Sequence, residues 1–504
     1  MDLAQLIRRQ RAYFQTGATR SLGYRRAQLH KLHDALVAHE PALLAALHAD
    51  LRKSAYEAYT TELGLVLSEV RHALRCLPAW MRPQRRRTPL LAWPARGHIQ
   101  PEPYGVALIM GPWNYPLQLL LSPLVGALAA GNCVVLKPSE FAPHAAAAIA
   151  QLIGATFPEE YIAVVQGERE TAEALLRERF DSIFFTGSTG VGRAVMAAAA
   201  RHLTPVTLEL GGKCPCLVCA DAPLDITARR IAWGKFMNAG QTCVAPDFVL
   251  VDRRLHSALV EALKRAIHQF YGADPQKSGD YGRIVNRKHL DRLTSYLAGT
   301  FDSRVAADVS RRHNGRQENA PTDVGGYTLS ASRAERETRG PATGRIVHGG
   351  QHDPDDLYLA PTILTGVSDD APVMQQEIFG PILPVLEFDN LDDALALLRD
   401  RPTPLALYLF TNDRPTQERV LAATHSGGVC LNDTVTHASG KDLPFGGLGE
   451  SGLGAYHGKA SFDCFTHRRS VLWRSFRFDL KQRYPPSRVS LTALKRAYRF
   501  LLGG

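Results

Sequence analysis

Hydrophobic residues recur along this 504-residue chain with two different spacings. Up to residue 80 they return every three to four positions, as at Leu29, Leu32 and Leu36, and this spacing predicts helices over residues 3–80. From Val106 onward, short apolar runs alternate with longer stretches of helical spacing, which predicts strands that are each followed by a helix. The strands are expected at residues 106–110, 133–136, 162–165 and 182–185, and the helices at residues 117–130, 145–153, 170–179 and 192–200.

Strands that are apolar throughout and alternate with helices predict a parallel, doubly wound sheet. A similar alternation resumes after Glu209 and continues to about Leu409, which predicts a second domain of the same kind. The expected fold class is therefore α/β with two doubly wound, Rossmann-type domains. In such sheets, ligands bind beyond the carboxyl ends of the strands.

Two segments interrupt the alternation. Residues 83–104 hold five prolines and the run Arg85–Arg87, which predicts an irregular connection or an edge strand rather than core. Residues 299–343 are rich in Arg, Ser, Asn, Thr and Gly, and their apolar residues follow neither the helical nor the strand spacing. We therefore expect a solvated, poorly ordered insertion there. The sequence assigns this insertion no function.

Composition narrows the class of protein. A hydrophobic content of 45% and a charged content of 21% are those of an ordinary soluble protein. The eight cysteines follow no framework spacing, which favours free thiols in a reducing cytosol, and the Cys214–Cys219 run reads as a strand rather than a metal site. We expect no signal peptide, because no apolar core follows the charges of residues 1–9, and no transmembrane helix, because no apolar run reaches about 18 residues.

Most of the net charge of +10 lies at the C-terminus. From Arg468 onward, ten Lys and Arg residues stand against the single acid Asp479, so this tail carries nine of the ten excess charges. The remainder is close to neutral, which argues against a nucleic-acid partner. Residues 491–502 drawn as a helix separate a basic sector from an apolar one.

The residues around Cys243 suggest a reactive thiol. This cysteine follows Asn238-Ala239-Gly240-Gln241-Thr242, a small, polar, glycine-containing stretch, whereas a cysteine used for packing usually lies in an apolar run. A thiol that attacks needs an approach path and a setting that favours the thiolate. Gly240 allows backbone amides to come close to the sulfur or to an oxygen bonded to it.

Polar residues also follow two of the predicted strands. Asn114, in Gly111-Pro112-Trp113-Asn114-Tyr115-Pro116, could donate its amide to a developing oxyanion, or it could make the hydrogen bond of an ordinary turn asparagine. Lys137 and Glu140 could grip the two ribose hydroxyls of an adenosine. A solvated strand end with these residue types is the commoner arrangement.

Two further strand ends carry glycines and an acid. The turn from Gly187 to Gly192 opens a predicted helix and could bind a pyrophosphate, although it lacks the usual Gly-x-Gly-x-x-Gly pattern. Glu209 lies between leucines, and burial there would raise the pKa of its carboxyl group, as suits a general base. The alternative is a glutamate paired with Lys213.

Together these motifs resemble the NAD(P)-dependent aldehyde dehydrogenase family over nearly the whole chain. Glu377-Ile378-Phe379-Gly380-Pro381 and Pro444-Phe445-Gly446-Gly447 add to the match. The residues around Cys243 and the segment Asp479–Pro486 resemble the branch with the dimeric class-three, fatty aldehyde and coniferyl aldehyde dehydrogenases. The resemblance implies oxidation of a medium- or long-chain aliphatic or aromatic aldehyde to the carboxylic acid, through a cysteine thiohemiacetal and a thioester.

The resemblance also implies a role for each matched position. Cys243 would be the nucleophile, Asn114 and the Cys243 amide the oxyanion hole, and Glu209 the base for the hydrolytic water. The cofactor, NAD or NADP, would be bound by Trp113, Lys137, Glu140, Gly187, Ser188, Gly190, Val191, Gly192, Glu377 and Phe379, and no metal is expected.

The domain boundaries follow from the same resemblance. Residues 1–82 and 103–208 would form the cofactor-binding domain and residues 209–445 the catalytic domain. A small oligomerisation β-arm would comprise residues 83–102 and 468–476, and residues 477–504 would form a basic amphipathic tail. A homodimer is expected.

Several alternatives stay open at this point. The chain could be a CoA-acylating or acyl-phosphate-reducing member of the same superfamily, although Glu209 argues against both, or a non-catalytic protein on an enzyme scaffold. The tail helix could cap the active site, contact a dimer partner, lie on anionic lipid or pack on its own subunit. A cytoplasmic protein is expected, with contact to the membrane surface as an option. The aldehyde and the preference for NAD or NADP are not specified, although Glu140 would repel a 2′-phosphate, and Leu65 and Tyr115 are guesses for the substrate pocket.

Overall fold

The computed structural model describes residues 2–88, 92, 94–298, 344–477, 479, 484–485 and 489–502. The predicted insertion at residues 299–343 lies outside the described residues. Two compact units are present, and each is described by itself. Unit 1 comprises Met1–Asp50, Ala55–Leu210 and Ala438–Gly504, and unit 2 comprises Leu51–Ser54 and Gly211–His437.

Unit 1 begins with helices, as the spacing of its apolar residues predicts. They are α1 (Leu3–Gln15), α2 (Leu22–Ala38), α3 (Glu40–Leu51), α4 (Ala55–Ala58) and α5 (Gly64–Trp80), with a π-helical turn at Tyr59–Leu63 between the last two. The buried residues Leu29, Leu32 and Leu36 form one face of α2. The prediction of helices over residues 3–80 is confirmed.

The sheet of unit 1 has six strands in the order β17-β7-β6-β3-β4-β5. They are β3 (Val106–Met110), β4 (Cys133–Lys137), β5 (Ile162–Val164), β6 (Ser182–Thr186), β7 (Val206–Glu209) and β17 (Gly452–Leu453), of which only β17 is antiparallel. The helices between them are α6 (Gln118–Ala130), α7 (Pro143–Thr156), α8 (Arg169–Arg177) and α9 (Thr189–Ala200), and α16 (Lys459–Cys464) follows β17. The predicted doubly wound parallel sheet is confirmed.

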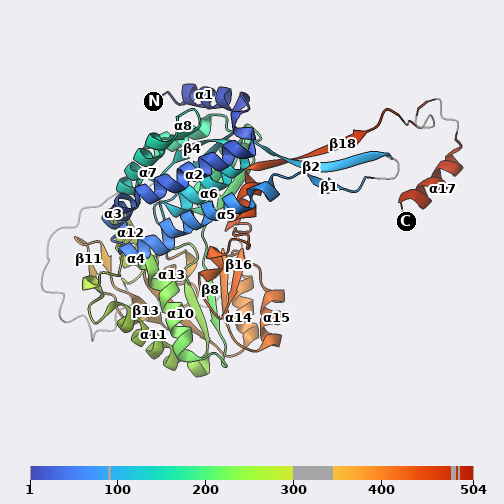
Figure 1. Cartoon of the computed structure of the whole chain (residues 1–504). Helices are drawn as coiled ribbons and strands as arrows, with labels where there is room; N and C mark the ends of the chain where they lie inside the picture. The colour runs from blue at the N-terminus through green and yellow to red at the C-terminus, as the bar shows by residue number, and fades with distance from the viewer. Residues whose placement is uncertain are drawn as a thin grey trace. The chain divides into compact units, whose positions relative to one another are not determined.

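Helix α6 lies at the centre of unit 1. All its residues are buried, and it lies against β3 and β4, with α2 and α5 packed against it (Figure 1). A helix that is apolar on every side is a core helix when it is too short to span a membrane. Among the residues that the structure describes, no helix is both long and apolar enough to cross a membrane.

Unit 2 contains the second sheet, in the order β10-β13-β14-β9-β8-β15-β16. Its strands are β8 (Pro215–Val218), β9 (Phe248–Asp252), β10 (Arg345–His348), β13 (Thr362–Thr365), β14 (Ile382–Phe388), β15 (Ala406–Phe410) and β16 (Gly428–Leu431), with β10 antiparallel and the others parallel. Its longer helices are α10 (Leu224–Phe236), α11 (His256–Tyr271), α12 (Arg287–Ser295), α14 (Leu391–Arg399) and α15 (Arg414–Ala423), and α13 (Pro372–Gln375) is a single turn. A two-stranded sheet, β11 (His352–Asp353) with β12 (Tyr358–Leu359), completes the unit. The alternation thus continues past Leu409 to β16.

Three strands form a separate antiparallel ribbon in unit 1. They are β1 (Gln84–Arg86), β2 (Ala95–Pro103) and β18 (Thr466–Arg474), with β2 in the middle (Figure 1). Of the two alternatives expected for this segment, an irregular connection or a strand outside the core, residues 95–103 form the strand. Proline is tolerated at 101 and 103 because β1 pairs only with residues 97–99, so β2 has β18 as its single neighbour there.

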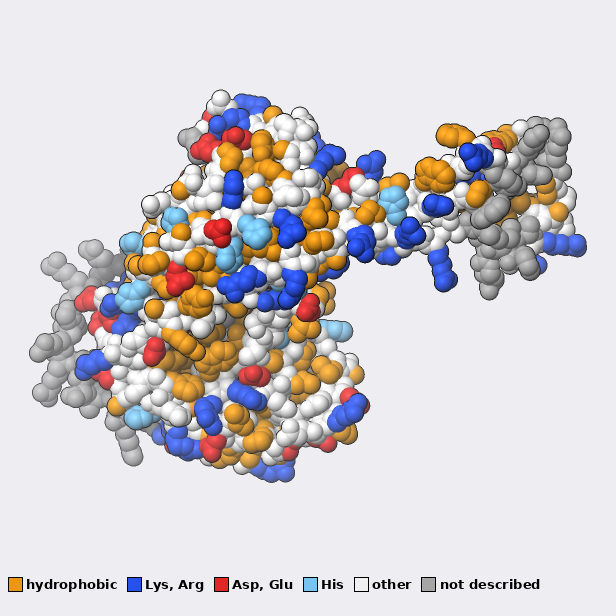
Figure 2. All heavy atoms as spheres, in the orientation of Figure 1, with side chains coloured by type: hydrophobic (Ala, Val, Ile, Leu, Met, Phe, Trp, Pro, Cys, Tyr) orange, Lys and Arg blue, Asp and Glu red, His pale blue; other side chains and the backbone are white. Residues whose placement is uncertain are grey.

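The ribbon exposes both basic and apolar side chains on the face drawn in Figure 2. Leu472 and Trp473 of β18 are 59% and 57% exposed, and Phe476 just beyond it is fully exposed. Helix α17 (Leu491–Leu502) follows at the C-terminus, as the apolar and basic sectors of residues 491–502 predict.

Candidate active site

Cys243 follows a turn with unusual backbone geometry. Asn238, Ala239 and Gly240, which follow α10, have φ values of 53°, 51° and 74°. Left-handed backbone costs a residue with a Cβ on the order of 1–2 kcal/mol, and strain of this kind is concentrated at functional sites. At Gly240, an added Cβ would lie 2.3 Å from the carbonyl oxygen of Gly380, so only glycine fits. The Cys243 side chain is half-buried.

Gln241 fixes this turn from inside the protein. Its side chain is fully buried, and its Nε2 donates to the carbonyl oxygens of Asn238 at 3.0 Å and Arg283 at 2.9 Å. Its Oε1 accepts from the amide of Val285 at 2.9 Å. A buried amide with both ends bonded favours one conformation of the turn. The left-handed residues are therefore fastened to the segment that precedes α12.

The main chain at the nucleophile is also bonded to the sheet of unit 2. The Cys214 thiol, just before β8, donates to the carbonyl oxygen of Cys243 at 3.4 Å. The hydroxyl of Tyr408, on β15, donates to the carbonyl oxygen of Val244. These contacts hold the main chain that carries the thiol against the strands of the core. All eight cysteines of the chain are free thiols.

An ion pair links the segment after Cys243 to the segment before β14. The ammonium of Lys213 binds the carboxylate of Asp247 and also donates to the carbonyl oxygens of Val373 at 2.7 Å and Gln376 at 3.1 Å. The Asp247 carboxylate accepts from the amide of Ile378 at 3.0 Å. The sequence does not reveal this pair, because its partners lie 34 positions apart and in different motifs.

Glu377 and Phe379 lie in the segment that this pair holds. Gly211 makes room for the Glu377 carboxyl group, since a Cβ there would lie 2.2 Å from its Oε2. The Oε1 atom is buried and has no hydrogen-bond partner within the described part of the chain. Burial, together with the charge of Asp247, raises the pKa of Glu377 to about 8. Phe379 has a strained φ of 48°.

Four of the predicted motifs meet at one edge of the sheet in unit 1. Strands β7, β6, β3 and β4 are consecutive neighbours, and their carboxyl ends lead to Glu209, Gly187, Gly111 and Lys137. The amide of Gly187 donates to the carbonyl oxygen of Glu209 at 3.0 Å, and the amide of Gly111 donates to that of Lys137 at 3.1 Å. Ligands bind at such an edge in doubly wound sheets.

Asn114 lies in the turn between β3 and α6. Its side chain is 2% exposed, and Trp113 beside it is half-buried. Gly111 lets the turn approach the helix, because a Cβ there would lie 3.0 Å from the Cβ of Leu120. Burial of an amide side chain at this place makes its orientation depend closely on the backbone of the turn.

Lys137 and Glu140 form an ion pair at the end of β4. The Lys137 Nζ lies 2.7 Å from the Glu140 carboxylate; the lysine side chain is buried, and the glutamate remains half-buried. A cation and an anion held side by side offer a donor and an acceptor to a pair of adjacent hydroxyl groups.

The turn from Gly187 to Gly192 opens α9, as expected, although the helix begins at Thr189. Ser188 is the N-cap, and its hydroxyl accepts from the amide of Val191. Gly192 lies against Leu210, whose Cδ2 would be 2.6 Å from an added Cβ, whereas the space beside Gly190 is open. A helix N-terminus with open space above it suits a phosphate group.

Glu209 ends β7 and is 2% exposed. Neither of its carboxyl oxygens has a hydrogen-bond partner among the residues that the structure describes. Burial raises the pKa of this carboxyl group well above its usual range. The alternative of a pair with Lys213 is not observed, because that ammonium binds Asp247.

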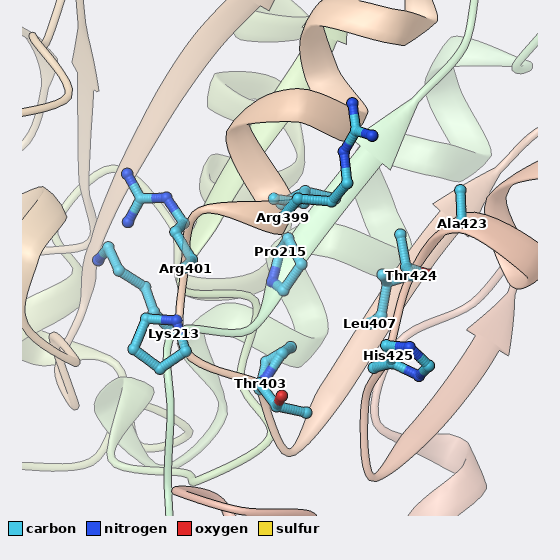
Figure 3. Close-up of a pocket in the computed structure, with 12 residues that line it drawn as sticks. Lys213, Pro215, Arg399, Arg401, Thr403, Leu407, Ala423, Thr424 and His425 are labelled. Carbon is cyan, nitrogen blue, oxygen red and sulfur yellow. The ribbon is translucent and has the colours of Figure 1, made fainter.

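A cavity of unit 2 is a separate feature. It has a volume of about 120 Å³, and its lining includes Lys213, Arg401, Thr403 and His425 but none of the predicted site residues. Figure 3 shows the Lys213 and Arg401 side chains extending to the same side; their charged ends bind Asp247 and Asp369. The cavity thus has no free basic group from these two residues. In the described part of the chain, no group of His, Cys, Asp and Glu side chains could hold a metal ion.

Known proteins resemble this chain over nearly its whole length. The family model described as "Aldehyde dehydrogenase family" matches residues 1–343 and 300–471. The 4,4′-diaponeurosporen-aldehyde dehydrogenase of Staphylococcus aureus is 42% identical and covers 97% of each chain. The dimeric NADP-preferring aldehyde dehydrogenase of Canis lupus familiaris is 41% identical over 97% of this chain and 99% of its own.

Solved structures show the same relationship. The substrate-bound state of Staphylococcus aureus AldH has a TM-score of 0.87 at 41% identity, covering 98% of this chain and 99% of that chain. The P. syringae indole-3-acetaldehyde dehydrogenase AldA, in complex with NAD+ and IAA, has a TM-score of 0.79 at 25% identity, covering 94% and 89%. Matches of this extent, in sequence and in fold, establish that the chain belongs to the aldehyde dehydrogenase family.

Proposed function

We propose that this protein oxidises an aldehyde to the free carboxylic acid with NAD or NADP, through a thiohemiacetal and a thioester on Cys243. The observation that carries this proposal is Glu209, a buried carboxyl group whose oxygens have no partner in the described structure. Hydrolysis of a thioester needs a base that activates water, and transfer of the acyl group to CoA does not. Glu209 therefore favours release of an acid.

The chemistry begins with attack of the Cys243 sulfur on the aldehyde carbon. The bond that forms places negative charge on the aldehyde oxygen. Asn114 donates its side-chain amide to that oxygen, together with the backbone N–H of Cys243, and loss of one such donor typically costs about 10²–10³ in rate. Covalent capture divides a difficult oxidation into steps with lower barriers.

The described residues fit a nicotinamide dinucleotide. Lys137 and Glu140 would hold the adenine ribose, and Glu377, whose Oε1 lacks a partner in the described chain, would accept from the nicotinamide ribose. The pyrophosphate would lie at the N-terminus of α9, and Trp113 and Phe379 would complete the site. The residues at this place are Gly187 and the N-cap Ser188, which precede α9, and Gly190, Val191 and Gly192 in its first turn. When bound, the nicotinamide supplies the acceptor for the hydride that leaves the substrate carbon.

Glu209 then acts on the thioester. Its carboxylate form takes a proton from water, the resulting hydroxide adds to the thioester carbon, and the carbon–sulfur bond breaks. Glu209 passes its proton to the leaving sulfur, so the products are a carboxylic acid and the Cys243 thiol, and the Glu209 carboxylate is restored. Because burial raises the pKa of Glu209, the carboxylate form that this step needs becomes more populated as the pH rises.

Binding of the cofactor should depend on the ionisation of Glu377. Its pKa of about 8 means that the carboxyl group is mostly protonated at pH 7 and ionised above pH 8. The ionised form accepts through both oxygens and makes stronger hydrogen bonds to the two ribose hydroxyls than the protonated form does. We expect the Kd for NAD to fall by up to about tenfold between pH 7 and 9, as measured by fluorescence titration. Glu377→Gln should bind more weakly and lose this pH dependence; an unchanged dependence would reject the assignment.

The substrate we propose is a medium- or long-chain aliphatic aldehyde or an aromatic aldehyde. The names of the relatives support this class, since one acts on 4,4′-diaponeurosporen-aldehyde and another on indole-3-acetaldehyde. The assay would compare aldehydes of these kinds with NAD and NADP, ranked by kcat/KM.

We further propose a cytoplasmic homodimer joined through the ribbon of β1, β2 and β18. Strand β18 lies at the edge of that ribbon and exposes Leu472 and Trp473, and an open apolar edge favours pairing with a second chain. The name of the canine relative, a dimeric enzyme, supports the same assembly. Eight free thiols agree with a reducing compartment.

One assay separates this function from its alternative. The purified protein is given an aldehyde and NAD or NADP, with and without CoA, and both products are quantified. We expect one carboxylate for each reduced cofactor and no effect of CoA. Formation of acyl-CoA would instead assign the protein to acyl transfer, and absence of turnover with every aldehyde would reject both.

A further inference from the structure

Helix α6 begins without a cap from its own sequence. Its N-cap position is Leu117, whose backbone is already helical and whose side chain has no polar atom. The cap comes instead from Glu62, 55 positions earlier in the chain. The Glu62 Oε2 accepts from the amide of Leu117 at 2.8 Å and from that of Gln118 at 3.3 Å. A carboxylate at the N-terminus of a helix satisfies amides that have no partner within the helix. Its negative charge also interacts favourably with the positive end of the helix dipole.

Glu62 is presented by a widened helical turn. It lies in the π-helical turn Tyr59–Leu63, and the Thr61 hydroxyl bonds back to the carbonyl oxygen of Glu57 at 2.7 Å. Gly64 suits the exit of this turn, because an added Cβ would lie 2.8 Å from the carbonyl oxygen of Tyr59. Turns of this type add a residue to the helix, and they are frequent at functional sites.

Hydrophobic burial stabilises α6 in addition to this cap. Every residue of that helix is buried, so hydrophobic contacts on all sides stabilise it. The Glu62 side chain is itself 0% exposed, and burying a carboxylate costs free energy that its hydrogen bonds only offset. Besides satisfying the end of the helix, the cap fixes how the chain enters α6.

The hydrogen bonds of Glu62 orient the turn that precedes α6. Asn114 lies three positions before Leu117, in a turn that ends at Pro116 and is buried. Fixing the amides of Leu117 and Gln118 fixes the end of this turn. We propose that Glu62 is a positioning residue that sets the direction in which Asn114 points its amide. This inference rests on the proposed role of Asn114 as a donor to the oxyanion.

A double-mutant cycle tests this coupling. Glu62→Ala and Glu62→Gln are each made in the wild-type protein and in Asn114→Ala, and kcat/KM for the aldehyde, the KM for NAD and the Tm are measured. We expect Glu62→Ala to lower kcat/KM about tenfold when Asn114 is present and less than twofold when it is absent. Glu62→Gln, which keeps an acceptor oxygen of the same reach, should recover most of the loss. The KM for NAD should not change.

Glu69 provides the matched control. It is a buried glutamate on α5 that also accepts from a backbone amide, that of Gly458 at 2.6 Å. Any effect of Glu69→Ala should be the same with and without Asn114. Equal losses for Glu62→Ala in both backgrounds would overturn the inference. If that variant does not fold, the same cycle with Glu62→Asp, whose shorter side chain withdraws the acceptor oxygens, decides in its place. No loss of activity in Asn114→Ala itself would overturn the proposed role of Asn114 and, with it, this inference.

Discussion

Cys243→Ala should abolish aldehyde-dependent formation of NADH, with a fall in kcat of at least about 10⁴. Without the sulfur, no covalent bond to the aldehyde carbon can form, and the remaining groups can only bind and polarise the substrate. The fold should persist, because the side chain is half-buried and the turn is held by Gln241 and by the carbonyl contacts of residues 243 and 244. Steady-state absorbance at the nicotinamide band measures the rate, and the Tm checks the fold.

Cys76→Ala is the matched control for this variant. Cys76 is another half-buried free thiol, on α5, and its removal should leave the rate unchanged. Retention of substantial activity in Cys243→Ala would mean that a different group carries the chemistry. Intact-mass and peptide analysis provide a second test. An acyl adduct on a residue other than Cys243 would also mean that a different group carries the chemistry.

Glu209→Gln should stop turnover after the first hydride transfer. The expected fall in kcat is about 10²–10⁴, since glutamine cannot take a proton from water. Formation of the thioester does not need this base, so a burst of up to one NADH per subunit should precede a slow steady state. Stopped-flow absorbance would measure the burst, and mass spectrometry would find the accumulated acyl group on Cys243.

The pH dependence of this variant gives a second readout. Burial raises the pKa of Glu209, so the wild-type kcat should rise with pH until the carboxyl group is ionised, and Glu209→Gln should lose that rise. Glu69 is a suitable comparison, because it is another buried glutamate with a pKa raised by burial. Glu69→Gln should keep the wild-type profile. If the kcat of Glu209→Gln still rises with pH as that of the wild type does, another residue must be the base.

Sequence patterns predicted the sheet of unit 1 closely, because β3 is apolar throughout and β4 and β6 each contain an apolar run. The strand at Val106–Met110 has the predicted bounds, and β4 and β6 each extend one residue further. The observed helix boundaries differ from the predicted ones where a capping residue, rather than the apolar spacing, decides where the helix begins. Helix α9 begins at Thr189 rather than at residue 192, since Ser188 caps it and the intervening glycines are tolerated in its first turn.

Contacts between distant residues could not be predicted. The Lys213–Asp247 pair and the Glu62 cap join positions that no local period relates. The positive φ values of Asn238 and Ala239 were also hidden, because alanine is not a residue that signals left-handed backbone. Pro101 and Pro103 left both an irregular connection and an edge strand open, and the structure has a strand there, paired with β18.

The fastened turn before Cys243 has a consequence for how the enzyme responds to different aldehydes. Gln241 and the left-handed residues 238–240 hold the thiol's main chain in place before any substrate arrives. Little reorganisation energy is then needed at the sulfur when it is acylated or released. Differences in rate between aldehydes should consequently reflect the shape and solvation of the substrate rather than rearrangement of the protein.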